Sequence, residues 1–124
     1  MCTRLVFLFC LLASCSTSRM TETVLYFGQS KPDGSTVTAK EWEQFNQTYI
    51  SKVFKEGYSV TSINGFWKDT VTNKLISEHT YEVTYCYKRS AAISKRIDSL
   101  CYRYKTIFQQ QSVLRVDHKV KASF

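Results

Sequence analysis

The spacing of apolar and polar positions along the chain predicts two amphipathic helices. A stripe of apolar residues, three or four positions apart, begins at Trp42 and ends at Phe54. The capping-box pattern Thr38-Ala39-Lys40-Glu41 precedes it and Gly57 follows it. A second stripe of this kind runs through residues 90–110. Each helix therefore has one apolar face that must pack against another element.

Four further segments have the β-branched and aromatic composition of strands. They cover residues 23–27, 58–63, 75–87 and 112–116, and the last could extend to Phe124. Asn64-Gly65 predicts a turn or bulge after the second of them. In the third, polar positions alternate with an aromatic and apolar set that should face the helices, Tyr81, Val83, Tyr85 and Tyr87.

The resulting order of elements, β-α-β-β-α-β, predicts an α+β domain of the ferredoxin-like kind. Its four strands would form an antiparallel sheet with both helices on one face. In that arrangement Cys86 faces away from the helices, whereas Cys101 lies on the helix stripe that faces the sheet. A disulfide between them would need a bulge before Cys86, so we expect two unpaired thiols.

An apolar run near the N-terminus sets the boundaries of this domain. Arg4 precedes the unbroken apolar stretch 5–12, which has the length of a secretory signal and is too short to span a bilayer. The next residues, Leu12-Ala13-Ser14-Cys15, resemble the bacterial lipoprotein box, in which the cysteine receives lipid and becomes the first residue. We expect a signal peptide over 1–14, a lipidated Cys15 with a polar tether over 15–21, and one domain over 22–124.

Two alternatives remain open for this segment. Ordinary signal cleavage between Ser14 and Ser18 would release a soluble, secreted or periplasmic protein. Cys15 could also be only a small apolar residue at the end of a membrane-seeking stretch. We favour the lipid anchor because the cysteine stands where the apolar run stops, after two small residues. Ser16 stands where an aspartate would favour the inner membrane, so the resemblance points to the outer membrane.

The net charge of +7 becomes +6 once Arg4 is removed with the signal. The excess lies late in the chain, where a single acid, Asp98, faces six cations: Lys88, Arg89, Lys95, Arg96, Arg103 and Lys105. A basic helix can bind anionic lipid headgroups or nucleic acid. We interpret it as a solvated face and expect no nucleic-acid partner, because an exported protein rarely meets one. His79 and His118 lack metal-ligand spacing, so no metal or other cofactor is expected.

An ordered set of motifs resembles one family. The set comprises Leu25-Tyr26-Phe27-Gly28, Pro32-Asp33-Gly34, Glu41-Trp42, Phe45, Phe54, Gly57, Gly65-Phe66-Trp67-Lys68-Asp69, Ile76, Glu78, Tyr104-Lys105, Phe108, Gln110 and Ser112-Val113-Leu114. Over residues 22–124 it is similar to the DUF3574 family, a bacterial domain of unknown function often found behind secretion signals. Two positions depart from the pattern: Ser51-Lys52-Val53-Phe54 stands where a Pro-containing stretch is usual, and Gln111 where Glu is common. The resemblance implies the class of domain and supplies no catalytic or binding residues.

Three residues are candidates for chemistry or binding. Glu78 either accepts backbone hydrogen bonds near Gly65-Phe66-Trp67 or acts as a general base. Arg115 could share the open sheet face with Glu78, and the two would then bind a polar ligand or form a cross-strand ion pair. Trp67 is either an aromatic lid over the core or a platform for a ligand.

No catalytic signature occurs in the sequence. It contains no Gly-x-Ser-x-Gly, no His-Glu-x-x-His and no glycine-rich phosphate loop. We expect a non-catalytic binding module of the cell envelope, held to a membrane by its N-terminal lipid, with an unidentified protein or small molecule as partner. The alternative is a small enzyme whose pocket, lined by Glu78, Arg115 and Trp67, is enclosed when two copies pair through their open sheet faces.

Overall fold

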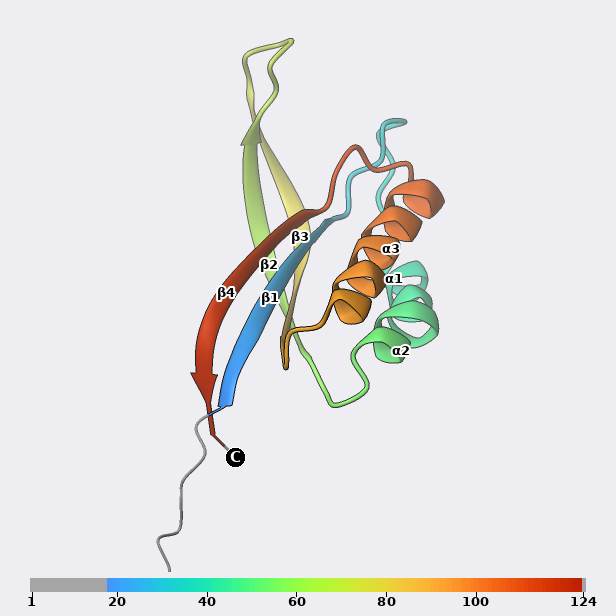
Figure 1. The fold of residues 1–124 in the computed structure, drawn as a ribbon. Coiled ribbons are helices and arrows are strands. Elements are labelled where there is room, and N and C mark those ends of the chain that lie inside the picture. The colour runs from blue at the N-terminus through green and yellow to red at the C-terminus, as the bar shows by residue number, and fades with distance from the viewer. Residues whose placement is uncertain (1–17, 124) are drawn as a thin grey trace, which may run out of the picture.

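The computed structural model describes residues 18–123 of the chain. The predicted signal peptide, Cys15 and the first tether residues lie outside this range. The elements in order are β1 (Ser18–Gly28), α1 (Ala39–Phe45), the π-helical turn η1 (Asn46–Ile50), α2 (Ser51–Val53), β2 (Ser59–Lys68), β3 (Leu75–Tyr87), α3 (Ala91–Phe108) and β4 (Leu114–Ala122). The strands form one antiparallel sheet in the order β2-β3-β1-β4, with the helices on one side (Figure 1). The predicted ferredoxin-like α+β fold is confirmed.

Local capping explains where the two helical segments begin and end. The hydroxyl of Thr38 accepts a hydrogen bond from the backbone N–H of Glu41, whose carboxylate accepts one from the backbone N–H of Thr38, so the predicted capping box forms. The helix then continues through α1, η1 and α2. Ser90 caps α3 with a single hydrogen bond, which its hydroxyl accepts from the backbone N–H of Ile93, and Gln109 ends the helix in the left-handed conformation. No helix within residues 18–123 is both long and apolar enough to cross a membrane.

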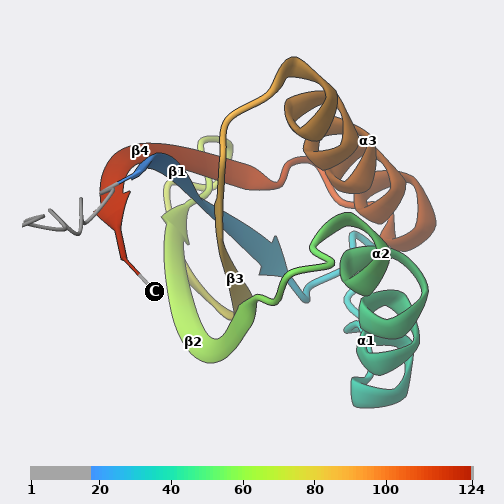
Figure 2. The ribbon, with the colours of Figure 1, turned by 60° about the horizontal axis from the view of Figure 1, so that its bottom comes forward.

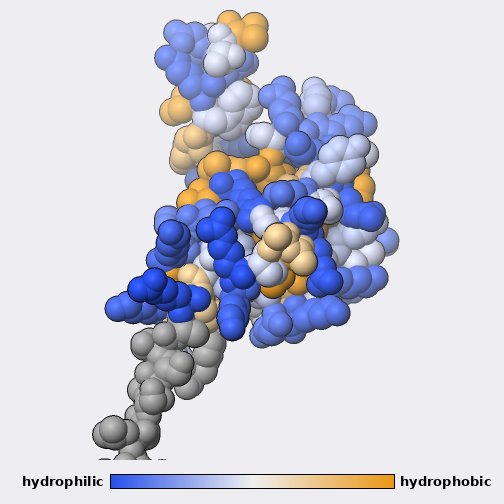
Figure 3. Space-filling view, in the orientation of Figure 1, coloured by the Kyte–Doolittle hydropathy of each residue, from blue (hydrophilic) through white to orange (hydrophobic). Residues whose placement is uncertain are grey.

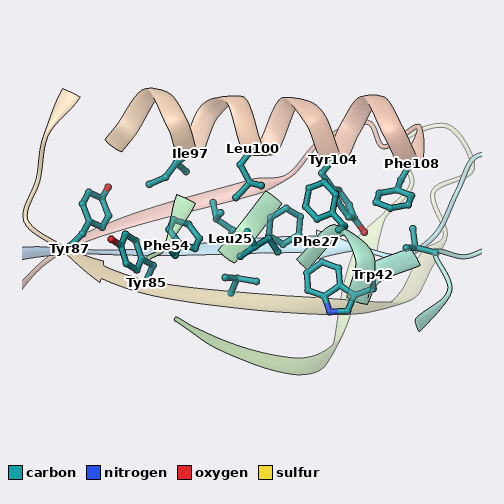
Figure 4. Close-up of a cluster of buried hydrophobic side chains, with 14 residues drawn as sticks. Leu25, Phe27, Trp42, Phe54, Tyr85, Tyr87, Ile97, Leu100, Tyr104 and Phe108 are labelled. Atoms are coloured by element: carbon teal, nitrogen blue, oxygen red, sulfur yellow. The ribbon is translucent and has the colours of Figure 1, made fainter. Parts of the chain in front are cut away.

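An aromatic core lies between the sheet and the helices (Figure 4). Phe27 on β1 packs edge-on against Tyr104 on α3, with ring centroids 4.7 Å apart. Trp42 on α1 stacks on Tyr81 of β3 at 4.2 Å. The side of β3 that was expected to face the helices does so, and aromatic burial of this extent is the main stabilising contribution to so small a domain.

β1 begins five positions earlier than the strand predicted at 23–27, inside the segment expected to be tether. Ser18 pairs with Ala122 and Arg19 with Lys121, so β4 provides the partner for this polar stretch. Strand pairing with a neighbour outweighs weak local propensity, which is why the sequence pattern did not reveal these residues. The described sheet therefore begins before residue 22, where the domain was expected to start.

β2 runs without interruption through Asn64-Gly65, so the turn or bulge predicted there is wrong. Gly65 pairs with Glu78 in register, and a Cβ at this position would lie 3.1 Å from Oγ1 of Thr80. Gly65 therefore permits a close approach between the strands and does not reverse the chain. As a result the β2–β3 hairpin projects beyond the rest of the sheet (Figure 1).

The sheet is curled, with the helices outside the curve (Figure 2). Its open face is consequently concave, and Val24 and Thr80 on that face are only 9% and 6% exposed although no helix covers them. Cys86 lies on this face, whereas Cys101 packs against the core from α3. Both thiols are free, as the predicted faces implied.

Candidate functional site

Glu78 holds the end of β1. Its carboxylate accepts a hydrogen bond from the backbone N–H of Ser30 at 2.8 Å. A Cβ at Gly28 would lie 2.6 Å from Oε1 of Glu78, so the absence of a side chain at Gly28 makes room for the carboxylate. The structural role expected for Glu78 is thus observed with a different partner. Glu78 pairs with Gly65 across the β2–β3 ladder, but its carboxylate accepts the N–H of Ser30.

A buried hydrogen-bond network adjoins this carboxylate. The hydroxyl of Tyr104 donates to the carbonyl of Gly28 at 2.8 Å and accepts from Nε2 of Gln29 at 2.9 Å. Nε2 of Gln29 also donates to the carbonyl of Phe27. Burial is the main reason that the pKa of Tyr104 is raised, so this hydroxyl stays protonated and serves as a fixed donor. No pattern in the sequence pointed to Gln29, because its burial depends on α3 closing over the end of β1.

Arg115 lies on the helix side of the sheet and connects β4 to α3. Its guanidinium donates to Asp98 at 2.7 Å and pairs with Asp117 at 3.1 Å. The predicted sharing of a face with Glu78 is therefore wrong. Leu114 and Val116, the residues on either side of Arg115, point to the open face of the sheet. Because side chains alternate along a strand, Arg115 points toward the helices. Arg115 and Glu78 serve separate structural roles.

Trp67 lies near the end of β2, on the open face opposite Ile76, and is 42% exposed. It is not a lid over the core, where Trp42 is the buried indole. Its surroundings on the projecting hairpin are also exposed and apolar: Phe66, Val71 and Leu75. Figure 3 shows an apolar side chain at the tip of this hairpin. Trp67 is thus exposed, whereas Glu78 and Arg115 are half-buried.

A groove of about 420 Å³ lies between α2 and α3, and we call it the interhelical groove. Its walls are Thr48, Tyr49, Lys52, Val53, Lys95, Arg96, Ser99, Leu100 and Arg103. The charged residues in this lining are all cations, and the remainder are apolar side chains and hydroxyls. The guanidinium of Arg103 lies 5.4 Å from the ring centroid of Tyr49, a distance at which a cation and an aromatic face attract each other.

The cations of the interhelical groove have no acidic partner in the described part of the chain. The ion pairs found there join Lys31 to Glu41 and Arg115 to Asp98 and Asp117. Part of this site follows from the sequence alone, since the spacing of residues 96, 99 and 103 places them on one face of a helix. The sequence does not predict that Lys52 joins them, because its position depends on how the two helices pack. Within residues 18–123, no group of three or more His, Cys, Asp and Glu residues is placed to hold a metal ion.

Several solved structures share this fold at low sequence identity. A phage SAM lyase in complex with S-methyl-5'-thioadenosine is 14% identical, covers 90% of this chain and 96% of its own, and has a TM-score of 0.59. CutA from Synechococcus elongatus is also 14% identical, covers 90% of this chain and 87% of its own, and has a TM-score of 0.56. The B. subtilis GlnK–ATP complex is 8% identical over 85% and 84%, with a TM-score of 0.50. At such identities the likeness establishes the fold.

No curated protein matches the sequence. One family model does: the protein of unknown function DUF3574 matches residues 22–124, which contain nearly all of the described sheet and both helical segments. The match spans the Glu78 anchor, the Tyr104 network and the interhelical groove. The chain belongs to the DUF3574 family.

Proposed function

We propose that this chain is an exported, lipid-anchored, non-catalytic binding module of the bacterial cell envelope, and that its interhelical groove binds an anionic ligand. The observation that carries the ligand class is the lining of the groove, in which the charged side chains are all unpaired cations. Unpaired cations around a concave surface attract anions and raise their local concentration.

The chemistry of the groove suits a small organic anion better than a bare inorganic ion. Arg96 and Arg103 offer planar donor sets that match carboxylate and phosphate groups, while Lys52 and Lys95 add compact charges. An apolar part of the ligand would contact Val53 and other carbon-rich side chains of the same lining. The volume of about 420 Å³ lies within the range of small-molecule sites.

The proposed location rests on Cys15. It follows an apolar run of signal length and two small residues, in the order of a lipoprotein box. Multiple acyl chains on this cysteine would hold the protein on the membrane essentially irreversibly, with the outer membrane as the favoured site. Mass spectrometry of the mature N-terminus tests this proposal. The expected result is a triacylated Cys15 as first residue, and an unmodified N-terminus at any position between 14 and 18 would contradict it.

Calorimetric titration tests the ligand class. With citrate and inorganic pyrophosphate as probes at low ionic strength, we expect saturable binding of at least one of them to the full chain. Arg96→Ala and Arg103→Ala should each weaken that binding at least tenfold. Lys68→Ala, a cation on the projecting hairpin, is the matched control and should change the affinity less than twofold. Failure of both probes to bind, or an equal loss in the control, would contradict a site in the groove.

A second candidate, a small enzyme completed by a second copy of the chain, is favoured by the projecting hairpin. Val71 at the hairpin is 90% exposed and Phe66 is 65% exposed, as expected for side chains that become buried in an assembly. The phage SAM lyase of the same fold gives this candidate a concrete assay. Incubation with S-adenosylmethionine, followed by mass spectrometry for S-methyl-5'-thioadenosine, should show no product if the chain is a non-catalytic module. Product formation that Phe66→Ser abolishes along with self-association would favour the enzyme.

A further inference from the structure

Five exposed cations surround the point at which the chain enters β1. They are Arg19, Lys88, Arg89, Lys119 and Lys121, and we call the surface that they form the tether-end face. Strand pairing brings them together from three parts of the sequence. Arg19 pairs directly with Lys121, while Thr21 pairs with Lys119 on one side and with Tyr87, the residue before Lys88, on the other. Figure 3 shows strongly hydrophilic side chains at this end of the sheet.

These cations are unpaired, since none of them takes part in the ion pairs found in residues 18–123. Arg19 and Lys121 are moreover direct cross-strand partners of like charge, an arrangement that disfavours the strand pairing. Glu22 points to the opposite side of the sheet, where it faces Cys86 and His118. Asp117 lies on the same side as Lys119 and interacts with Arg89, but its carboxylate is already paired with Arg115. Five cations against this one shared acid leave the tether-end face with a net positive charge.

The opposite end of the sheet has a smaller excess of positive charge. On the β2–β3 hairpin, Lys68 and Lys74 flank Asp69. The carboxylate of Asp69 accepts hydrogen bonds from the loop at Val71 and Thr72, which is the main reason that its pKa is lowered and that it stays ionised. Positive charge is thus concentrated at the end of the sheet from which the N-terminal segment leaves.

We infer that the tether-end face binds the anionic headgroups of the membrane in which the lipid is inserted. This inference rests on the lipidation of Cys15 proposed above, because the anchor determines which surface of the domain meets the bilayer. Basic residues close to a membrane surface are attracted to its anionic headgroups, so beside a lipid anchor they would orient the domain on the bilayer.

The length of chain between anchor and domain supports the inference. Three residue steps separate Cys15 from Ser18, the first residue of β1. A fully extended chain spans at most about 3.6 Å per residue, so the start of β1 can be no more than about 11 Å from the lipidated residue. The Debye length at physiological ionic strength is about 8 Å. The bound on the distance is little more than one Debye length, so the cations beside the start of β1 are held where the charge of the headgroups is only partly screened.

Vesicle flotation of the full chain carrying Cys15→Ser tests the surface without the lipid. We expect binding to phosphatidylglycerol–phosphatidylcholine vesicles that exceeds binding to phosphatidylcholine alone at least tenfold and decreases in high salt. The phosphatidylcholine arm measures any contribution of the apolar N-terminal run. Lys119→Glu combined with Lys121→Glu should abolish most of the difference between the two vesicles. Lys68→Glu combined with Lys74→Glu, at the far end, makes the same change in net charge and should reduce it less than twofold.

Each outcome has a definite meaning. Equal losses in the two double variants would show that only net charge matters, and binding that does not depend on phosphatidylglycerol would likewise overturn the inference. So would a 20-nucleotide DNA that displaces the protein from the vesicles at equal phosphate concentration, because that result assigns the surface to nucleic acid. Lys119→Gln with Lys121→Gln should lower the anionic-vesicle preference to an intermediate value, and circular dichroism checks that each variant folds. If the native chain lacks lipid but still binds anionic vesicles, the anchor proposal fails and the inference about the tether-end face stands. If the native chain is lipidated but shows no preference for anionic vesicles, the anchor proposal stands and the inference fails.

Discussion

The carboxylate of Glu78 occupies the space beside Gly28 that a methyl group would fill. A Cβ at Gly28 would come within 2.6 Å of Oε1 of Glu78, and the same oxygen accepts the backbone N–H of Ser30. A glycine without a side chain and an acid 50 positions away in sequence thus form one structural unit, because β1 and β3 lie side by side.

Gly28→Ala should destabilise the domain. The carboxylate of Glu78 would have to move away, and the charge-assisted hydrogen bond from Ser30 would be lost. We expect a loss of about 1–3 kcal/mol in the free energy of unfolding, measured by urea denaturation. The double variant with Glu78→Ala provides the control, since the carboxylate that clashes is then absent. Simple addition of the two single losses would contradict the proposed coupling.

Tyr104→Phe should also destabilise the domain, by about 1–3 kcal/mol in urea denaturation. The substitution removes the hydroxyl that donates to the carbonyl of Gly28 and accepts from Gln29, and it leaves both buried groups without that partner. Tyr102→Phe, two positions earlier on the exposed face of α3, is the matched control and should change stability by less than about 0.5 kcal/mol. Similar losses in the two variants would contradict a specific role for the buried hydroxyl.

Acid should weaken the connection between β4 and its neighbours. Burial raises the pKa of Asp117, but hydrogen bonds from Thr23 and Arg115 outweigh it and hold the pKa below the ordinary 3.8. The unfolded chain therefore takes up this proton more readily. The stabilisation from Asp117 is present above about pH 4 and is lost as the pH falls through the lowered value.

The free energy of unfolding, measured from pH 6 to pH 2, should fall less steeply for Asp117→Asn than for the unmodified chain below pH 4. Other carboxyl groups with lowered pKa values, including that of Glu41 in the capping box, account for the slope that remains. A slope unchanged by Asp117→Asn would show that the hydrogen bonds to this carboxylate do not favour its ionised form.

The two described thiols should differ in reactivity. Cys86 is exposed on the open face, whereas burial raises the pKa of Cys101 to about 11. Burial raises the pKa of Cys86 as well, so neither is an activated nucleophile. Brief alkylation with iodoacetamide at pH 8, followed by peptide mass spectrometry, should label Cys86 at least tenfold faster than Cys101. In urea the two rates should converge, and convergence without urea would contradict the placement of Cys101.

The sequence was informative where local chemistry determines structure. The pattern at Thr38 and Glu41 is a capping box because both hydrogen bonds span only three residues, and the alternation through β3 reports directly which face is buried. These signals were sufficient for the order of elements and for the fold.

Contacts between segments that are distant in the sequence were harder to predict. The position of Arg115 between apolar Leu114 and Val116 predicts that it lies on the face opposite them, away from the core, but Leu114 is itself 59% exposed. Asn64-Gly65 has the composition of a turn, yet its pairing with β3 keeps it in a strand. The interhelical groove needs Lys52 from one helix and Arg103 from the other, so it depends on how the two helices pack. In each case tertiary packing outweighs the local signal.

The early start of β1 has a mechanical consequence. β1 is an inner strand, hydrogen-bonded to β3 on one side and β4 on the other. A force applied through the chain ahead of Ser18 therefore acts along the axis of an inner strand and loads many backbone hydrogen bonds in shear at once. An edge strand pulled from its side would instead unzip one bond at a time. Under the proposed lipidation of Cys15, this arrangement would let the domain bear tension between the membrane and a bound partner.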